Sequence, residues 1–376
     1  MSKNGLEEPS GSQPTPKETT PLITKGGENG NGGGKNGGLS VGQTSMLIAG
    51  EMAGSGVLAL PRALVRTGWI GVPIIILMCL VAAFSGKRLG DCWTILEERN
   101  PQLRSRKRNP YAIIADQTLG KTWSVVVSMA IIVTLFGASV VYLLMAAQII
   151  EQLLLTLIPT LTICTWYLIV VGAMTPLIFF NSPKDLTFTG VIAFGSTVIA
   201  CILYFIEMMN EVRPFVFRWG VHGFTDFFLA FGTIMFAFGG ASTFPTIQND
   251  MTDKSQFGKS IQYSFGDSVG WRVLIRLSIM GAILFIGESI PRFYTILALV
   301  GGTTVALLTY ILPSFCYLSL INQTPREGQT PIETPGWVKL LCYEVIALGV
   351  LGAVAATYSG LSAVFSSAVT TPCYLR

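Results

Sequence analysis

Charged residues are scarce in this sequence. Of its 376 residues, 12% are charged and 51% are hydrophobic, whereas a typical soluble domain carries about 25% charged residues. The hydrophobic residues gather into repeated stretches of about 20, which is long enough to cross a hydrocarbon layer of ~30 Å. Lipid offers the backbone no hydrogen-bond partners, so helices that satisfy their own backbone groups are favoured. We therefore predict an all-α membrane protein built from a bundle of spanning helices.

Residues that form catalytic and metal sites are also few. The sequence has one histidine, His222, and its seven cysteines are scattered without paired spacing. These cysteines are Cys79, Cys92, Cys164, Cys201, Cys316, Cys342 and Cys373. We expect them to be small core residues rather than a disulfide framework or a metal site. The sequence shows no nucleophile–base pair or metal-ligand cluster, so we expect no enzyme activity, no catalytic residues, no cofactor and no nucleic-acid partner.

The first residues lack the apolar core of a signal peptide, so we expect no cleaved signal. Residues 1–40 are instead rich in Gly, Ser, Pro, Thr and Asn. Because so few of them are apolar, they favour a disordered tail over a packed domain. We expect a transmembrane domain over residues 41–366, followed by a short C-terminal tail at 367–376.

Nine candidate spans follow the tail, with ends uncertain by several residues: about 43–64, 70–90, 122–150, 163–180, 186–207, 226–246, 272–288, 293–320 and 338–364. Lys and Arg outnumber Asp and Glu in the loop after the second span, which places this loop in the cytosol. Counting spans from there puts the N-terminal tail in the cytosol as well. The same count puts Arg62, Arg66 and the C-terminus on the opposite side.

Small residues weaken the first span near its middle. Gly54, Ser55 and Gly56 lie shortly before Pro61, and each glycine weakens a helix by roughly 1 kcal/mol relative to alanine. One interpretation is an interrupted helix, whose unbonded N–H groups line a cavity and attract a carboxylate. The alternative is that these small residues allow close packing against another helix.

Glu51 is the only carboxylate in the first span. An ionised acid at the bilayer centre costs on the order of 3 kcal/mol, so such residues usually face a polar cavity and have a function there. Glu51 would bind the amine of a substrate, or carry a coupling proton if burial raises its pKa. A protonated or paired structural acid is the alternative.

The sixth span repeats the pattern of the first. Gly239 and Gly240 lie within it, and Pro245 follows. Two spans interrupted by Gly and Pro, five apart in order, point to a binding site between inverted repeats of five helices. The alternative is a kinked packing helix.

Two further candidates lie outside these spans. Tyr142 of the third span would cap a substrate, although a buried Tyr is as often a packing residue. In the tail, Glu18 precedes the pair Leu22 and Ile23 by four residues, which resembles an acidic dileucine sorting signal read by clathrin adaptor complexes. It is equally an ordinary stretch of a disordered tail.

Several stretches together resemble the amino acid/auxin permease family of the amino acid/polyamine/organocation superfamily. They are residues 54–61, 68–71, 236–240, 244–251, 290–291, 300–302 and 312–314. The resemblance implies a leucine-transporter-type fold of two inverted five-helix repeats and proton-coupled symport of amino acids. It also implies that Gly54, Ser55 and Gly56 hold the substrate carboxylate. Phe236, Ala237, Phe238 and Gly239 would then meet the amine and the side chain.

The sequence departs from this family in its number of spans. The family usually has eleven, whereas here residues 260–266, which resemble the start of a seventh span, run directly into 267–272, which resemble the approach to a ninth. Two spans are thus missing, including the eighth, which normally helps to form the coupling-ion site.

We therefore carry two hypotheses for the function. The first is a proton-coupled transporter of small amino acids in an endolysosomal or plasma membrane, whose partners are an amino acid, a proton, membrane lipid and adaptor complexes. The second is a shortened, transport-inactive isoform that senses amino acids or regulates its full-length sibling.

Overall fold

A computed structural model of the chain describes residues 55–101, 103, 109–176, 195–200, 202, 203, 206, 210, 223–240, 269–289, 293–323 and 334–365. The chain divides into two units, Met1–Asn36 and Gly37–Arg376, and every described residue belongs to the second. Within this described part all regular secondary structure is helical, which confirms the all-α prediction.

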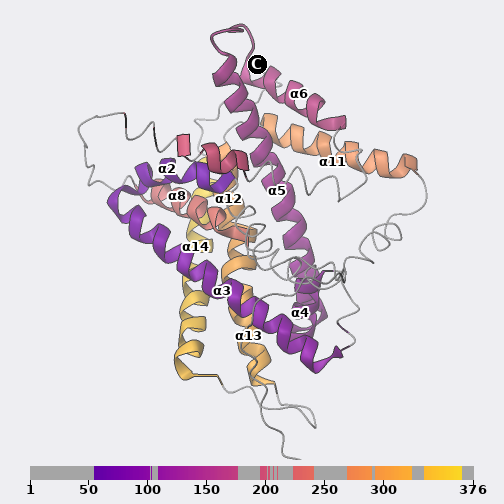
Figure 1. The fold of residues 1–376 in the computed structure, drawn as a ribbon, viewed down its shortest axis with the longest axis vertical. Coiled ribbons are helices and arrows are strands. Elements are labelled where there is room, and N and C mark those ends of the chain that lie inside the picture. Colours follow the sequence, from indigo (N-terminus) through magenta and orange to yellow (C-terminus); the bar gives the residue numbers. More distant parts are fainter. Residues whose placement is uncertain are drawn as a thin grey trace, which may run out of the picture. The chain divides into compact units, whose positions relative to one another are not determined.

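The helices follow one another along the chain with short connections (Figure 1). They are α2 (Ser55–Thr67), the 3₁₀ turn η1 (Gly68–Ile70), α3 (Gly71–Arg99), α4 (Pro110–Leu119), α5 (Lys121–Leu154), α6 (Ile163–Met174), α8 (Phe224–Ala237), α11 (Val269–Ser289), α12 (Phe293–Val300), the π-helix η5 (Gly301–Ile311), α13 (Leu312–Asn322) and α14 (Gly336–Phe365).

Four helical runs are long and apolar enough to cross a membrane: Leu58–Arg99, Lys121–Leu154, Phe293–Asn322 and Gly336–Phe365. Shorter apolar helices occupy Ile163–Met174, Phe224–Ala237 and Leu277–Ser289. The first run joins α2 to α3, and Gly68 breaks it with a left-handed φ of 63°, a conformation that glycine adopts without a steric cost. The chain is therefore a multi-pass membrane protein, and its first two expected spans are separated at Gly68.

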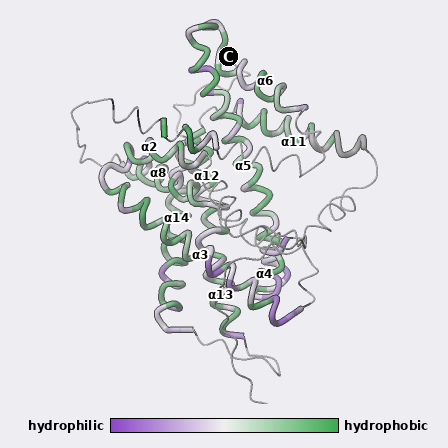
Figure 2. Tube along the Cα trace, viewed as in Figure 1, coloured by the Kyte–Doolittle hydropathy of each residue, from purple (hydrophilic) through white to green (hydrophobic). Residues whose placement is uncertain are grey.

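Most of these helices expose an apolar face. Ile76 and Leu80 of α3, Ile132 of α5 and Leu351 of α14 are between 57% and 71% exposed, and Figure 2 shows hydrophobic residues along most of these helices. A soluble monomer rarely exposes apolar surface on this scale. Against lipid tails the same surface carries no penalty, so these faces are suited to contact the bilayer.

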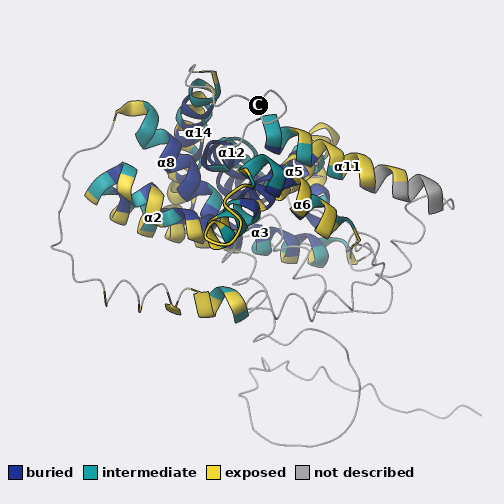
Figure 3. Cartoon of the chain, turned by 90° about the horizontal axis from the view of Figure 1, so that it is seen from above, coloured by how far each residue is buried: buried dark blue, intermediate teal, exposed yellow. Residues whose placement is uncertain are grey.

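The run Phe293–Asn322 lies in the interior of the bundle. Its apolar window is 72% buried, against 22–28% for the other three runs, and Figure 3 shows buried residues concentrated on α8 and α12. Glycines let the backbones approach closely here: Gly301 packs on the carbonyl oxygen of Gly232, and a Cβ on Gly302 would lie 2.7 Å from the Cβ of Ala356. Small residues are the usual means of close helix packing in membranes.

Hydroxyl groups from three neighbouring helices bind the π-helix η5. Tyr111 of α4 donates to the Leu308 carbonyl at 2.6 Å, and Thr357 of α14 donates to the Gly302 carbonyl at 3.2 Å. Thr134 of α5 donates to the Thr304 hydroxyl, also at 2.6 Å. Burial raises the pKa of Tyr111 well above its usual value, so its hydroxyl stays protonated and able to donate. The bonds offset the irregular backbone pairing of a π-helix, which occurs most often at functional sites.

The short helix α4 lies in a stretch that the sequence assigned to a cytosolic loop. It begins at Pro110, a residue favoured in the first turn of a helix, and it buries Tyr111, Ile114 and Ala115. Ser319 of α13 donates to the carbonyl of Thr118 at 2.7 Å. The loop is therefore partly folded against the bundle, which the charge count could not reveal.

The cysteines follow the sequence expectation in part. Cys92, Cys316 and Cys342 are free and fully buried, as small core residues should be, and Cys79 is free but exposed. Cys164, at the start of α6, is disulfide-bonded. The expectation that the cysteines form no disulfide is therefore wrong for Cys164, because a fold brings together cysteines whose spacing in the sequence is not paired.

Candidate functional site

Helices α2 and α8 pack against each other in opposite directions. At one end of the pair, Gly56 lies directly against the backbone of Ala237, so that no side chain fits between them. At the other end, Arg66 Nη1 donates to Asp226 Oδ1 at 2.8 Å. These two contacts join the start of α2 to the end of α8, and the end of α2 to the start of α8.

Only part of the expected carboxylate site belongs to the described residues. Gly56 is buried, and the room left by its missing side chain is filled by Ala237. Ser55 is the first residue of α2 in the structure, and only its backbone is described. Gly54 and Glu51 lie outside the described residues, as do Glu18, Leu22 and Ile23 of the tail. Their predicted roles stay predictions.

The second half of the expected site lies at the end of α8. Phe236 and Ala237 form the last helical residues, Phe238 follows as the C-cap, and Gly239 continues the chain in a 3₁₀ conformation. Gly56 thus meets one member of this group, Ala237, directly. The structure brings together one residue of each glycine-containing span, as the two-span prediction requires.

Two hydroxyls of η5 hold the end of α8 in place. Tyr310 donates to the Met235 carbonyl at 3.3 Å, and Thr309 donates to the Gly239 carbonyl at 3.2 Å. The last carbonyls of a helix have no partner within the helix, so these bonds come where they are needed. Sequence reasoning missed both residues, although hydroxyls inside the apolar stretch 293–320 were a visible signal.

Tyr142 lies apart from this group. It belongs to α5 and is 46% exposed, whereas its neighbours Val141 and Leu143 are buried. Its ring therefore points away from the packed side of α5 in this conformation. A substrate-capping role for Tyr142 stays a prediction.

A pocket of about 530 Å³ lies at the other end of the α2–α8 pair. This volume falls within the range of small-molecule sites. Its polar lining residues are Arg62, Arg66, Gln148, Thr225, Asp226, Tyr294 and Thr295, and its apolar ones are Leu229, Phe293 and Ala363. The pocket is therefore shared by α2, α5, α8, α12 and α14.

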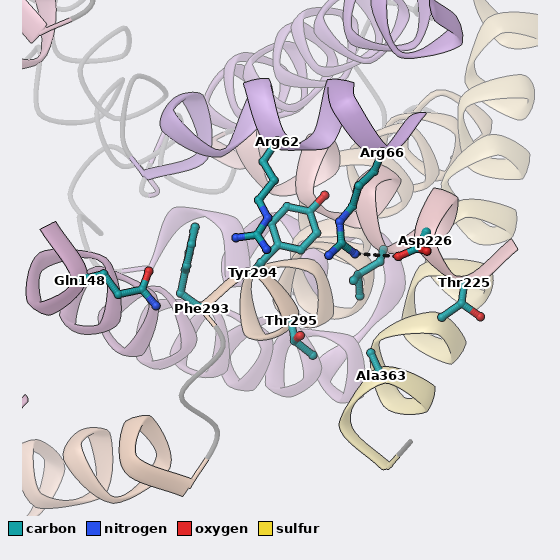
Figure 4. A pocket seen from close by; sticks show the side chains of 10 residues that line it. Arg62, Arg66, Gln148, Thr225, Asp226, Phe293, Tyr294, Thr295 and Ala363 are labelled. Atoms are coloured by element: carbon teal, nitrogen blue, oxygen red, sulfur yellow. Dashed lines mark hydrogen bonds and ion pairs between the residues drawn. The ribbon is translucent and has the colours of Figure 1, made fainter. Parts of the chain in front are cut away.

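Tyr294 lies between the two arginines of this pocket (Figure 4). The guanidinium carbons of Arg62 and Arg66 are 5.3 Å and 4.8 Å from the centre of its ring, within the range of cation–π attraction. Arg66 is also paired with Asp226. Among the described residues, Arg62 has no carboxylate partner, so the pocket retains one positive charge that is not balanced.

The sequence gave a faint signal for this pocket. Arg62 and Arg66 are four residues apart, which places them on one face of a helix, and Asp226 is in the first turn of α8. The arginines were counted only for topology, because nothing in the sequence brings them to Tyr294.

Comparison with known proteins decides the family. The sequence profile of the family described as "Transmembrane amino acid transporter protein" matches residues 37–265 and 262–359. The chain belongs to this family. Since it is a family of transporters, the expectation that the chain is not an enzyme is confirmed, and so is the resemblance to amino acid/auxin permeases.

The chain is similar to several amino acid transporters of Arabidopsis thaliana. It is 23% identical to the amino acid transporter AVT3B, over 96% of this chain and 99% of that protein. It is 20% identical to the amino acid transporter AVT1D, over 83% of this chain and 68% of that protein. No solved structure matches the chain significantly.

The family match is divided at a telling place. Its two stretches meet at residues 262–265, next to the join at Gly266 and Asp267 where two spans are expected to be missing. The alignment with AVT3B runs over 442 positions, more than the 376 residues of this chain. That relative of the transmembrane amino acid transporter family therefore contains segments with no counterpart here.

Proposed function

We propose that this chain is a secondary transporter of small amino acids, driven by a proton gradient. The observation that carries the proposal is the antiparallel pairing of α2 and α8, with Gly56 of one glycine-containing span against Ala237 of the other. Inverted repeats of a leucine-transporter-type fold produce such a pair around a central substrate site. The relatives named amino acid transporters support the substrate class.

The proposed central site divides an amino acid between the two spans. Backbone N–H groups of Gly54, Ser55 and Gly56 bind the carboxylate, because an interrupted helix leaves such donors unbonded. The segment from Phe236 through Ala237 and Phe238 to Gly239 meets the amine and the side chain, and Tyr142 caps the site. Alternating access around this site requires Gly56 and Ala237 to separate, since no side chain fits between them now.

Glu51 is the proposed proton carrier. A carboxyl group in low dielectric binds a proton more tightly than it does in water, so it is able to pick one up from an acidic compartment and release it to a neutral one. One proton moving down its gradient with each amino acid would drive accumulation of the substrate.

Exchange in proteoliposomes tests the proposal. Purified wild-type protein should exchange labelled for unlabelled L-alanine, and an acidic outside should accelerate the exchange. Glu51→Gln should remove this acceleration while exchange continues, because the backbone site is intact. Glu98→Gln, at an exposed position of α3, serves as the control and should behave as the wild type. Absence of exchange for every amino acid offered would refute the transporter proposal.

A second candidate function is a transport-inactive form that senses amino acids or regulates a full-length sibling. The divided family match and the extra segments of AVT3B favour it. The missing eighth span normally contributes to ion coupling in this fold, so coupling is the property most exposed to its loss. Saturable amino acid binding without exchange or accumulation would support this candidate over the first.

We place the protein in endolysosomal membranes, with the plasma membrane as the alternative. Glu18, Leu22 and Ile23 form the proposed sorting signal for clathrin adaptor complexes. The proposal depends on a cytosolic tail, in which adaptor complexes would have access to these residues.

A further inference from the structure

The pocket between Arg62 and Asp226 is separated along the helices from the proposed central site. Arg62 follows Gly56 by six residues, which is about 9 Å along α2. Asp226 precedes Ala237 by eleven residues, about 16 Å along α8. The two helices that carry the proposed central site therefore also carry the pocket, one to three helical turns away.

The charges of the pocket match the two ends of an amino acid. Arg62 is exposed and has no carboxylate partner among the described residues, and its planar guanidinium binds carboxylates through two parallel hydrogen bonds. Asp226 is half-exposed and uses Oδ1 to bind Arg66. A carboxylate accepts about four hydrogen bonds, so Asp226 retains room for an ammonium group.

The uncharged part of the lining sets the size and polarity of a ligand. Gln148, Thr225 and Thr295 add polar groups, whereas Leu229 and Ala363 supply a small apolar surface. Tyr294 packs under both guanidinium groups, which holds them over the pocket. A free anion would use the arginine alone, but a small amino acid uses the charges of both signs and the apolar surface.

We propose that this outer pocket is a second binding site for the amino acid that the protein carries, with Arg62 holding its carboxylate and Asp226 accepting from its ammonium group. The identity of the ligand rests on the proposed function. A molecule bound here lies on the route along α2 and α8 to the central site and raises the local concentration of substrate at its mouth.

Equilibrium binding to the full chain tests the site. Purified protein in phosphatidylcholine nanodiscs is titrated with labelled L-alanine, L-glutamate and L-lysine. Arg62→Gln should weaken the binding of the best of these roughly tenfold or more, because a hydrogen-bonded charge is lost. Arg62→Lys should restore part of the affinity. Propionate should displace the label from this site in the wild type, and L-alaninamide, which lacks the carboxylate, should not.

A second pair of variants tests the pocket without changing its charge. Ala363→Trp fills the pocket from α14 and should remove the binding that depends on Arg62. Val354→Trp, at a 67% exposed position of the same helix, should leave it unchanged. Melting temperatures of all variants, compared with the wild type, exclude unfolding as the cause of any loss.

The outcomes separate this inference from the proposed function. If the wild type exchanges amino acids and neither Arg62→Gln nor Ala363→Trp changes affinity or KM, the second site does not exist although transport does. If binding depends on Arg62 but no exchange occurs, the site stands and the transporter proposal fails. Absence of amino acid binding to the wild type, or an effect of Arg62→Gln confined to bilayers with phosphatidylserine, overturns the site, the latter in favour of a lipid headgroup.

Discussion

Gly56 is the residue on which the packing of α2 against α8 depends most directly. Its missing side chain lets the backbone of Ala237 approach, and a backbone cannot move aside as a flexible side chain does. We expect Gly56→Leu to destabilise the protein by about 1–3 kcal/mol and to abolish amino acid exchange. Thermal unfolding in detergent and exchange in proteoliposomes measure the two effects.

Gly281→Leu is the matched control for this substitution. Gly281 is exposed on α11, and a Cβ there has no neighbour within 4 Å. This variant should keep the melting temperature and the exchange rate of the wild type. Equal behaviour of the two leucine variants would contradict the close contact of Gly56 with Ala237.

The ion pair of Arg66 with Asp226 should add little to stability. The two side chains are 28% and 50% exposed, and ion pairs exposed to this degree contribute about 1 kcal/mol or less because water screens them. A double-mutant cycle with Arg66→Gln and Asp226→Asn, read by thermal unfolding, should therefore give a coupling energy no larger than about 1 kcal/mol that falls as salt is added. A larger coupling that salt does not change would mean that the pair is buried in the working protein.

Among the elements, the π-helix η5 is the one that fixes the end of α8. Tyr310→Phe and Thr309→Val remove the hydroxyl bonds to the carbonyls of Met235 and Gly239, at a cost of about 1 kcal/mol each. We expect faster hydrogen exchange at the amides of residues 236–240 in both variants. Ser139→Ala, which removes only a bond within α5, should leave this exchange unchanged. Unchanged exchange in all three variants would show that η5 does not hold α8.

For the molecule as a whole, the missing spans should limit coupling. Compared with a version that carries two further spans after Gly266, roughly 60 residues with their loops, this chain should bind amino acids more weakly. It should also accumulate little or none of them under an imposed pH gradient. Uptake into liposomes compares the two versions. Strong accumulation by the 376-residue chain would show that coupling does not need the missing spans.

The cellular location is a property of the whole chain that the tail is expected to set. Changing Leu22 and Ile23 to alanine should move the tagged protein from endolysosomal membranes to the cell surface, because an adaptor complex reads the apolar pair. Surface biotinylation of the two versions measures the shift. If the unchanged protein is already at the surface, the tail does not act as a sorting signal.

Element positions followed closely from the sequence where the signal was a long apolar run. The spans expected to begin at residues 122 and 338 correspond to α5 and α14 within two residues at the start, since hydrocarbon thickness dictates their length. Helix α4 was missed because its burial depends on α5 and α13, which are distant or separate in the pattern of the chain. The disulfide of Cys164 was missed for the same reason.

What the sequence determined by itself is the material of this protein: apolar helices, two glycine-containing spans, the transporter family and the join at Gly266. These follow from local composition and from strings that do not depend on neighbours. Only the tertiary structure decided that Gly56 packs on Ala237, that η5 holds the end of α8, and that Arg62, Arg66, Asp226 and Tyr294 share one pocket. Each of these contacts joins residues more than a hundred positions apart or on separate helices, and helix packing, not sequence spacing, sets such distances.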